Sequence, residues 1–171
     1  LRSQGIKAGL IAGKLLQPFP EAEIMGALAG KKAVTVLERS DQTALTAAFG
    51  CHIVQTEADD LLRLSRDVTP QQIEAKCAEI LNLFDTPDPG VDPVTTRLTP
   101  EHLHKAAFAA VTLDRFIAHH ELDGLAYYYE GDPGSPLRDL VTNLIVGNSL
   151  LTAAGFPMCG ESDLKTCIAM L

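Results

Sequence analysis

Two glutamates in the last third of the chain, Glu130 and Glu161, occupy positions where side chains could carry chemistry. Glu130 ends an apolar run that begins at Gly124, and Glu161 stands immediately before a segment with helical periodicity. Ligands of α/β folds bind in the crevice beyond the carboxyl ends of the strands, so acids where one element ends or begins are candidates for a site. Taken alone, each glutamate is also compatible with a solvated loop acid or a helix cap.

The segments around these glutamates predict alternating strands and helices. Residues 124–129 form a strand candidate, and a glycine- and proline-rich turn separates it from an apolar segment at 141–154 that predicts a buried helix. The final segment has apolar residues at the spacing of one helix face: Leu164, Cys167, Ile168 and Leu171. This stripe needs a packing partner.

The first part of the chain predicts a βαβ unit. Residues 7–12 are apolar, residues 21–29 have helical spacing after a proline-rich turn, and residues 33–37 are β-branched. A short strand is expected at 49–55. Parallel strands need both faces covered, so we expect an α/β fold of parallel-sheet βαβ segments with covering helices, here as an incomplete fragment.

Three helices are predicted in the middle of the chain. Residues 57–66 carry acids in the first turn and arginines in the last, which suits the helix dipole. Thr69 and Thr99 each precede a proline and an apolar stripe, which is typical of capped helix starts. Residues 85–98 contain three prolines and one glycine, so no regular element can cross them. The acids of this segment do not fit the spacing of a calcium-binding loop.

Histidines on the longest predicted helix raise the possibility of a metal site. His102 and His104 are two residues apart and do not share a helix face, whereas His119 and His120 are adjacent at the helix end. We therefore expect solvated positions or an interaction with the C-terminal dipole for all four, and a structural role for His52.

The cysteines lack the spacing of a zinc or disulfide set. None forms a CxxC pair, and three lie in apolar stretches, so we expect reduced, buried thiols of a cytoplasmic protein. The four are Cys51, Cys77, Cys159 and Cys167.

The composition argues against several function classes. The chain has 171 residues, of which 46% are hydrophobic, and 14 basic against 22 acidic residues give a net charge of −8. Without a basic cluster, no nucleic-acid partner is expected. Without an apolar run of about 20 residues, no membrane span is expected. Small molecules or proteins are the expected partners.

The first 45 residues or so resemble the transketolase-C-terminal-like domain of the pyruvate:ferredoxin oxidoreductase family. The resemblance lies in the order of a strand, a PFP turn, a helix and a strand that ends in VLER, with Gln17 where an arginine is common. It implies no chemistry in this segment, since the thiamine diphosphate site and the cluster-binding cysteines of that family lie elsewhere. Without the resemblance, the charged residues at this strand end indicate a solvated loop: Glu38, Arg39 and Asp41.

Residues from about 49 to 171 resemble the L-arabinose isomerase and L-fucose isomerase-like superfamily. The segment GESDLKTCIAML is similar to the family's GEGDWKT block, with Ser162 and Leu164 in place of glycine and tryptophan. FGCHIVQ, LDGLAYYYEG and NSLLTAAGFP follow in a compatible order.

The isomerase resemblance implies a metal site with two glutamates and two histidines. Glu130 and Glu161 match the glutamates and would be both metal ligands and catalytic acid–base residues, whereas the histidines would lie beyond Leu171. Mn²⁺ would polarise the carbonyl of an open-chain monosaccharide and hold the charge of the ene-diolate, while a carboxylate moves the proton between C1 and C2.

These patterns lead to one hypothesis and two alternatives. The hypothesis is that residues 1–45 are joined to a truncated isomerase domain at residues 49–171. The chain would then be a fragment of a metal-dependent aldose–ketose isomerase. We expect this fragment to be inactive alone and its full-length parent to be a homo-oligomer. One alternative is a fragment of a 2-oxoacid:ferredoxin oxidoreductase of the pyruvate type. The other is a chimeric, non-catalytic α/β domain joined near residues 44–48.

Overall fold

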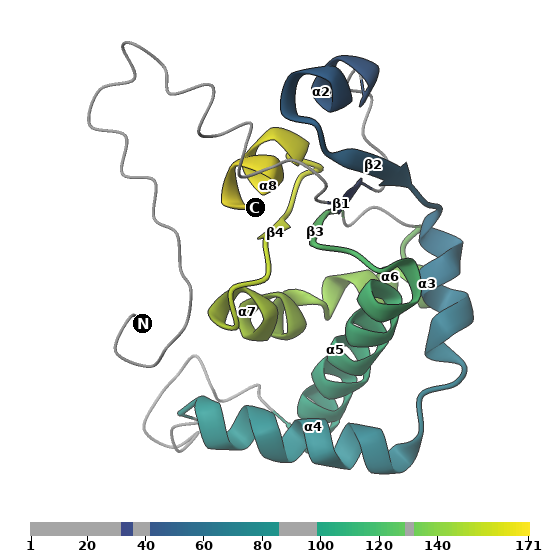
Figure 1. Cartoon of the computed structure of the whole chain (residues 1–171). Coiled ribbons are helices and arrows are strands. Elements are labelled where there is room, and N and C mark those ends of the chain that lie inside the picture. Colours follow the sequence, from purple (N-terminus) through teal and green to yellow (C-terminus); the bar gives the residue numbers. More distant parts are fainter. Residues whose placement is uncertain (1–31, 36–41, 86–98, 129–131) are drawn as a thin grey trace, which may run out of the picture. The chain divides into compact units, whose positions relative to one another are not determined.

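The computed structural model describes residues 32–35, 42–85, 99–128 and 132–171. The chain divides into two compact units. The sheet unit comprises Leu1–Glu57, Glu121–Tyr128 and Leu150–Leu171, and the helical unit comprises Ala58–His120 and Tyr129–Ser149. Figure 1 labels the elements of both units.

The sheet unit contains four parallel strands in the order β2-β1-β3-β4. Val34 of β1 pairs with Val54 of β2 on one side and with Leu125 of β3 on the other. This confirms the predicted α/β class with a parallel sheet. The strands are β1 (Lys32–Thr35), β2 (His52–Gln55), β3 (Gly124–Ala126) and β4 (Met158–Cys159).

The core of the sheet unit forms where α8 (Leu164–Met170) lies against β1, β3 and β4. Leu164, Cys167 and Ile168, three residues of the predicted stripe, are almost completely buried. They pack with Leu45, Cys51, Ala126 and Cys159. Burial was predicted for all four thiols, and it is confirmed for Cys51, Cys159 and Cys167. Cys77 in the helical unit is only half-buried.

The helical unit contains α3 (Ala58–Ser65), α4 (Pro70–Leu83), α5 (Pro100–His120) and α6 (Pro136–Thr142). The predicted cap of α4 is confirmed as a capping box, because the Thr69 side chain accepts the Gln72 N–H and the Gln72 side chain accepts the Thr69 N–H. Thr99 caps α5 by accepting the N–H of His102, and His102 Nδ1 accepts the Thr99 N–H in return. This histidine thus takes the place of the usual glutamate or glutamine.

Packing in the helical unit centres on α5, which lies against α3, α4 and α6. Its middle turns are almost fully buried, with Leu113 and Thr112 at 0% exposure. Thr112 is accommodated because its hydroxyl donates to the Phe108 carbonyl one turn earlier. No helix among residues 42–85, 99–128 and 132–171 combines the length and apolarity required to cross a membrane.

Several predicted element bounds were wrong. Phe49 ends a helix, α2 (Gln42–Phe49), instead of opening a strand, and Gly50 with φ of +67° separates that helix from β2. The apolar helix expected at 141–154 is interrupted, since α6 ends at Thr142 and α7 (Ile145–Ala153) begins after Asn143. The Asn143 side chain donates to the Asp139 carbonyl and so competes with continued helix formation.

A buried leucine and an exposed leucine of the helical unit give a direct check of this packing. Leu113 on α5 is fully buried and Leu81 on α4 is 51% exposed. We expect Leu113→Ala to lower the free energy of unfolding by about 2–5 kcal/mol through lost burial and a residual cavity. Leu81→Ala should change it by less than about 0.5 kcal/mol. Urea titrations followed by circular dichroism measure both, and equal effects would contradict the assigned core.

Candidate functional site

The structure describes one of the two glutamates predicted as metal ligands and catalytic residues. Glu161 is exposed in a turn between β4 and α8 and has a φ of +56°. Glu130 lies outside the described residues. Their pairing in a Mn²⁺ site therefore stays a prediction from the sequence.

The GESDLKT segment has a local structural explanation. Asp163 is the N-cap of α8, and its carboxylate accepts the Thr166 N–H at 2.9 Å and the Thr166 hydroxyl at 2.6 Å. Hydrogen bonds from Thr166 hold the pKa of Asp163 below its usual value. Ser162, with φ of +53°, donates its N–H to the Tyr127 carbonyl and ties the turn to the residue after β3. This segment thus has the features of a turn followed by a capped helix start.

We expect this turn to respond to two substitutions in opposite ways. Asp163→Ala removes the acceptor of the Thr166 N–H and should lower the melting temperature. Glu161→Gly relieves a left-handed backbone conformation and should leave stability unchanged or raise it by up to about 1 kcal/mol. Differential scanning calorimetry of both variants makes the comparison. Loss of stability in Glu161→Gly alone would indicate a role for this carboxylate that the turn does not explain.

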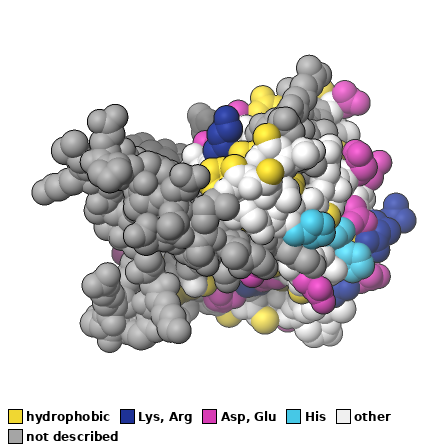
Figure 2. All heavy atoms as spheres, turned by 45° about the horizontal axis from the view of Figure 1, so that its top comes forward, with side chains coloured by type: hydrophobic (Ala, Val, Ile, Leu, Met, Phe, Trp, Pro, Cys, Tyr) yellow, Lys and Arg dark blue, Asp and Glu magenta, His cyan; other side chains and the backbone are white. Residues whose placement is uncertain are grey.

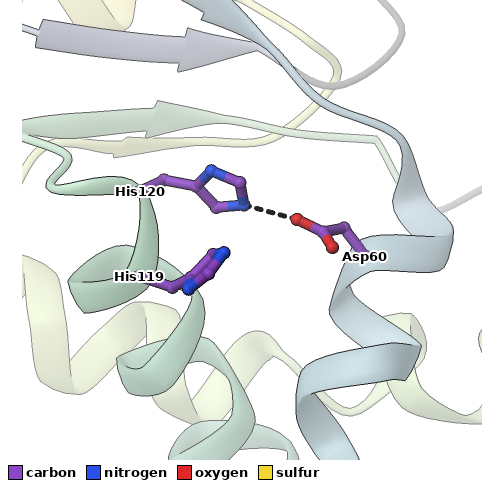
Figure 3. A group of neighbouring side chains, drawn as sticks. All are labelled: Asp60, His119 and His120. Atoms are coloured by element: carbon purple, nitrogen blue, oxygen red, sulfur yellow. Dashed lines mark hydrogen bonds and ion pairs between the residues drawn. The ribbon is translucent and has the colours of Figure 1, made fainter.

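A different group of side chains converges within the helical unit. Asp60 of α3 and His119 and His120 of α5 offer ligand atoms that all lie within 4.8 Å of one another. Figure 3 shows both imidazoles on the last turn of α5, with Asp60 facing them from α3. Among the described residues, these are the three potential metal ligands whose ligand atoms lie this close together. We call it the Asp60 cluster.

The Asp60 carboxylate is shared between the two helices. Oδ2 lies 2.6 Å from His120 Nε2, and Oδ1 accepts a hydrogen bond of 2.8 Å from Arg63 Nε on its own helix. The His120 ring is positioned by Phe116, whose ring centroid is 4.6 Å away and whose side chain is buried. The carboxylate is thus held on both oxygens.

The charges of the Asp60 cluster favour the ionised carboxylate. Burial raises the pKa of Asp60, but the hydrogen bonds and charges of Arg63 and His120 outweigh burial and place this pKa below its ordinary value. The helix dipoles act in the same direction, since Asp60 lies in the first turn of α3 and His120 in the last turn of α5. The dipole of α3 therefore favours the negative charge of Asp60, and the dipole of α5 favours a positive charge at His120.

The hydrogen-bonding pattern also assigns the two histidine rings. Arg63 Nη2 lies 3.3 Å from His119 Nε2, and a guanidinium group can only donate, so His119 Nε2 accepts and carries a lone pair. His120 Nε2 donates to the ionised Asp60. The cluster therefore contains one nitrogen whose electron pair accepts a hydrogen bond from Arg63 and one N–H group that donates to Asp60. Such groups are the components of a proton relay or a cation site.

Sequence reasoning missed this cluster because its parts are far apart in the chain. His119 and His120 are adjacent and their partner lies on a separate helix, so spacing alone gave no signal. Their expected role at the helix C-terminus was compatible with the structure but incomplete. One signal in the sequence could have indicated the cluster: an acid in the first turn of α3 and histidines in the last turn of α5. These side chains meet when the N-terminus of one helix packs beside the C-terminus of the other.

The cysteine thiols are poor candidates for chemistry. Burial raises the pKa of Cys51 and Cys159, and burial together with the neighbouring Cys159 thiol raises the pKa of Cys167 to about 12. Cys167 instead packs in the core with its thiol 3.8 Å from the Pro157 carbonyl. These thiols stay protonated near neutral pH and serve as small apolar side chains.

Comparison with known proteins bears on the first part of the chain. The family described as pyruvate:ferredoxin oxidoreductase core domain II matches residues 1–65. This region of the chain is similar to that family. No match was found among curated proteins.

The match corrects the main hypothesis drawn from the sequence. It continues without interruption through residues 44–48 and includes FGCHIVQ, which we had assigned to the isomerase resemblance. The enzyme class indicated is an oxidoreductase, so the assignment as an aldose–ketose isomerase of the arabinose or fucose type was wrong. Mn²⁺ and a monosaccharide had been implied by that resemblance alone, and they lose this support.

We expect the Asp60 carboxylate to make stability depend on pH. Because the folded-state pKa lies below the ordinary value of 3.8, the carboxylate stabilises the fold above that pH, and the stabilisation is lost as the pH falls through the lower folded-state pKa. Asp60→Asn should lower the free energy of unfolding by about 1–3 kcal/mol at pH 7, and the deficit should shrink in acid.

Asp59→Asn is the matched control, because Asp59 is the exposed neighbour on the same helix. Urea titrations of all three proteins between pH 7 and strong acid provide the measurement. If the free energy of unfolding of Asp60→Asn is lower than that of the parent chain by the same amount at the lowest pH, the assigned pairing of the Asp60 carboxylate with Arg63 and His120 is contradicted.

Proposed function

We propose that residues 1–65 act as a non-catalytic, core-domain-II-type part of a 2-oxoacid:ferredoxin oxidoreductase of the pyruvate type. The observation that carries the proposal is the family match to these residues. The match is to a domain of an oxidoreductase, and it is consistent with the resemblance of the PFP turn and the VLER strand end noted in the sequence.

The fold of the described part of this segment supports the proposal. The order β1–α2–β2–α3 is that of an α/β unit, and β1 pairs in parallel with β2 from Lys32 to Thr35. The family match ends at Ser65, which is also the last residue of α3. The match therefore stops at the end of an element and leaves no helix divided.

The chemistry of the segment supports a structural role. Its one cysteine, Cys51, is buried, and burial raises the pKa of this thiol, which makes it a poor cluster ligand near neutral pH. Asp60 and Arg63 are engaged with each other and with α5. We infer that the segment supports the fold of the enzyme, and that the reaction with the 2-oxoacid takes place on other parts of it.

A segment exchange tests this proposal. In a pyruvate:ferredoxin oxidoreductase, the stretch that aligns with residues 1–65 is replaced by residues 1–65 of this chain, and pyruvate-dependent reduction of ferredoxin is measured. We expect a soluble chimera that keeps measurable activity, because the packing pattern of the two segments should be equivalent.

A glycine–serine linker of equal length in the same position is the control, and it should abolish activity and lower solubility. A chimera that performs no better than the linker would contradict the proposal. A purified sample of the present chain is expected to show no pyruvate-dependent ferredoxin reduction by itself.

A further inference from the structure

We propose that the Asp60 cluster binds a divalent transition-metal ion of the zinc class, which links α3 to α5. This inference does not depend on the role proposed for residues 1–65. Two imidazole nitrogens and one carboxylate oxygen are a donor set that suits Zn²⁺ and neighbouring ions such as Co²⁺. The ligands would be Asp60 Oδ2, His119 Nε2 and His120 Nε2.

The distances fit an ion after small adjustments. Tetrahedral bonds of 2.0–2.2 Å hold the donor atoms about 3.4 Å apart. The contact between Asp60 Oδ2 and His120 Nε2 is 2.6 Å, and no donor pair of the cluster exceeds 4.8 Å. An ion would thus take the place of the proton shared by Asp60 and His120. The proton on His120 would move to Nδ1, as neutral imidazole permits.

Arg63 is the group that must adjust most. Its guanidinium is a positive charge beside the proposed ion, and its Nη2 uses the lone pair of His119 Nε2. The contact is long at 3.3 Å, and the Arg63 side chain is 53% exposed and can release it. The bond from Arg63 Nε to Asp60 Oδ1 can remain, because it leaves Oδ2 directed at His120. Hydrogen-bonded partners of this kind orient ligating carboxylates.

The surroundings favour a cation and permit its entry. His119 and His120 lie in the last turn of α5, where the helix dipole is negative. The side chains of His120 and Asp60 keep 17% and 23% of their exposure, and His119 is exposed. Figure 2 shows histidine side chains at the surface flanked by acidic and basic ones. An ion from solvent therefore needs no opening of the core to reach its ligands.

Titration of the metal-stripped chain with ZnCl₂ by isothermal calorimetry tests the proposal. We expect one Zn²⁺ per chain, a rise in melting temperature on binding, and visible absorption bands when Co²⁺ is used in place of Zn²⁺. His119→Ala should weaken binding by at least about tenfold and remove the Co²⁺ bands. His119 is exposed, so this variant is expected to fold normally, and circular dichroism checks this.

His104→Ala is the matched control, because His104 is exposed on the same helix and lies outside the cluster. It should bind Zn²⁺ as the parent chain does. Asp60→Asn and His120→Ala should weaken binding as His119→Ala does. The proposal is overturned if the parent chain binds no Zn²⁺, if His119→Ala binds as tightly as the parent, or if His104→Ala loses as much affinity.

Discussion

The Asp60 carboxylate joins two helices that lie far apart in the sequence. Its two oxygens are divided between Arg63 on α3 and His120 on α5, and the pKa of the carboxyl group is lowered as a result. Leu61 and Leu64 on the same helix are buried, so polar and apolar contacts together fix α3 in the helical unit. A buried charge without partners would be costly, and this arrangement supplies partners from both helices.

This junction also connects the family-matched stretch to the remainder of the chain. Asp60 lies within residues 1–65, whereas His119 and His120 lie outside that match. In the sheet unit, β1 of the matched stretch pairs with β3, which also lies outside it. The two sequence segments that we separated at residues 45–49 therefore contribute to the same sheet, whatever their origin.

Local patterns in the sequence were sufficient for much of the fold. The threonine–proline caps and the periodic stripe of α8 depend on near neighbours, and each was predicted. The strand expected at 7–12 and the helix expected at 21–29 lie outside the described residues, so the βαβ unit predicted there stays a prediction. Errors arose where a side chain competed with the backbone, as Asn143 does between α6 and α7. The two-residue strand β4 was missed because its pairing with β3 comes from tertiary context and is not visible in a period of two residues.

The candidate site was harder to predict because it depends on helix packing. The isomerase resemblance pointed to Glu161 as a metal ligand. In the structure Glu161 lies in an exposed turn, and Asp163 caps the helix that follows, so the GESDLKT segment is explained by local structure. The Asp60 cluster was invisible because its members approach only after α3 and α5 have packed. A family likeness carried by short blocks was thus a weaker guide than the match over a continuous stretch.

The strand order β2-β1-β3-β4 has a consequence for synthesis on the ribosome. β1 receives β2 after a short crossover, but its other neighbour, β3, is made only after α3, α4 and α5. During that interval one edge of β1 exposes unpaired backbone groups, which can pair with strands of other nascent chains. Slow translation through the helical segment would lengthen this exposure.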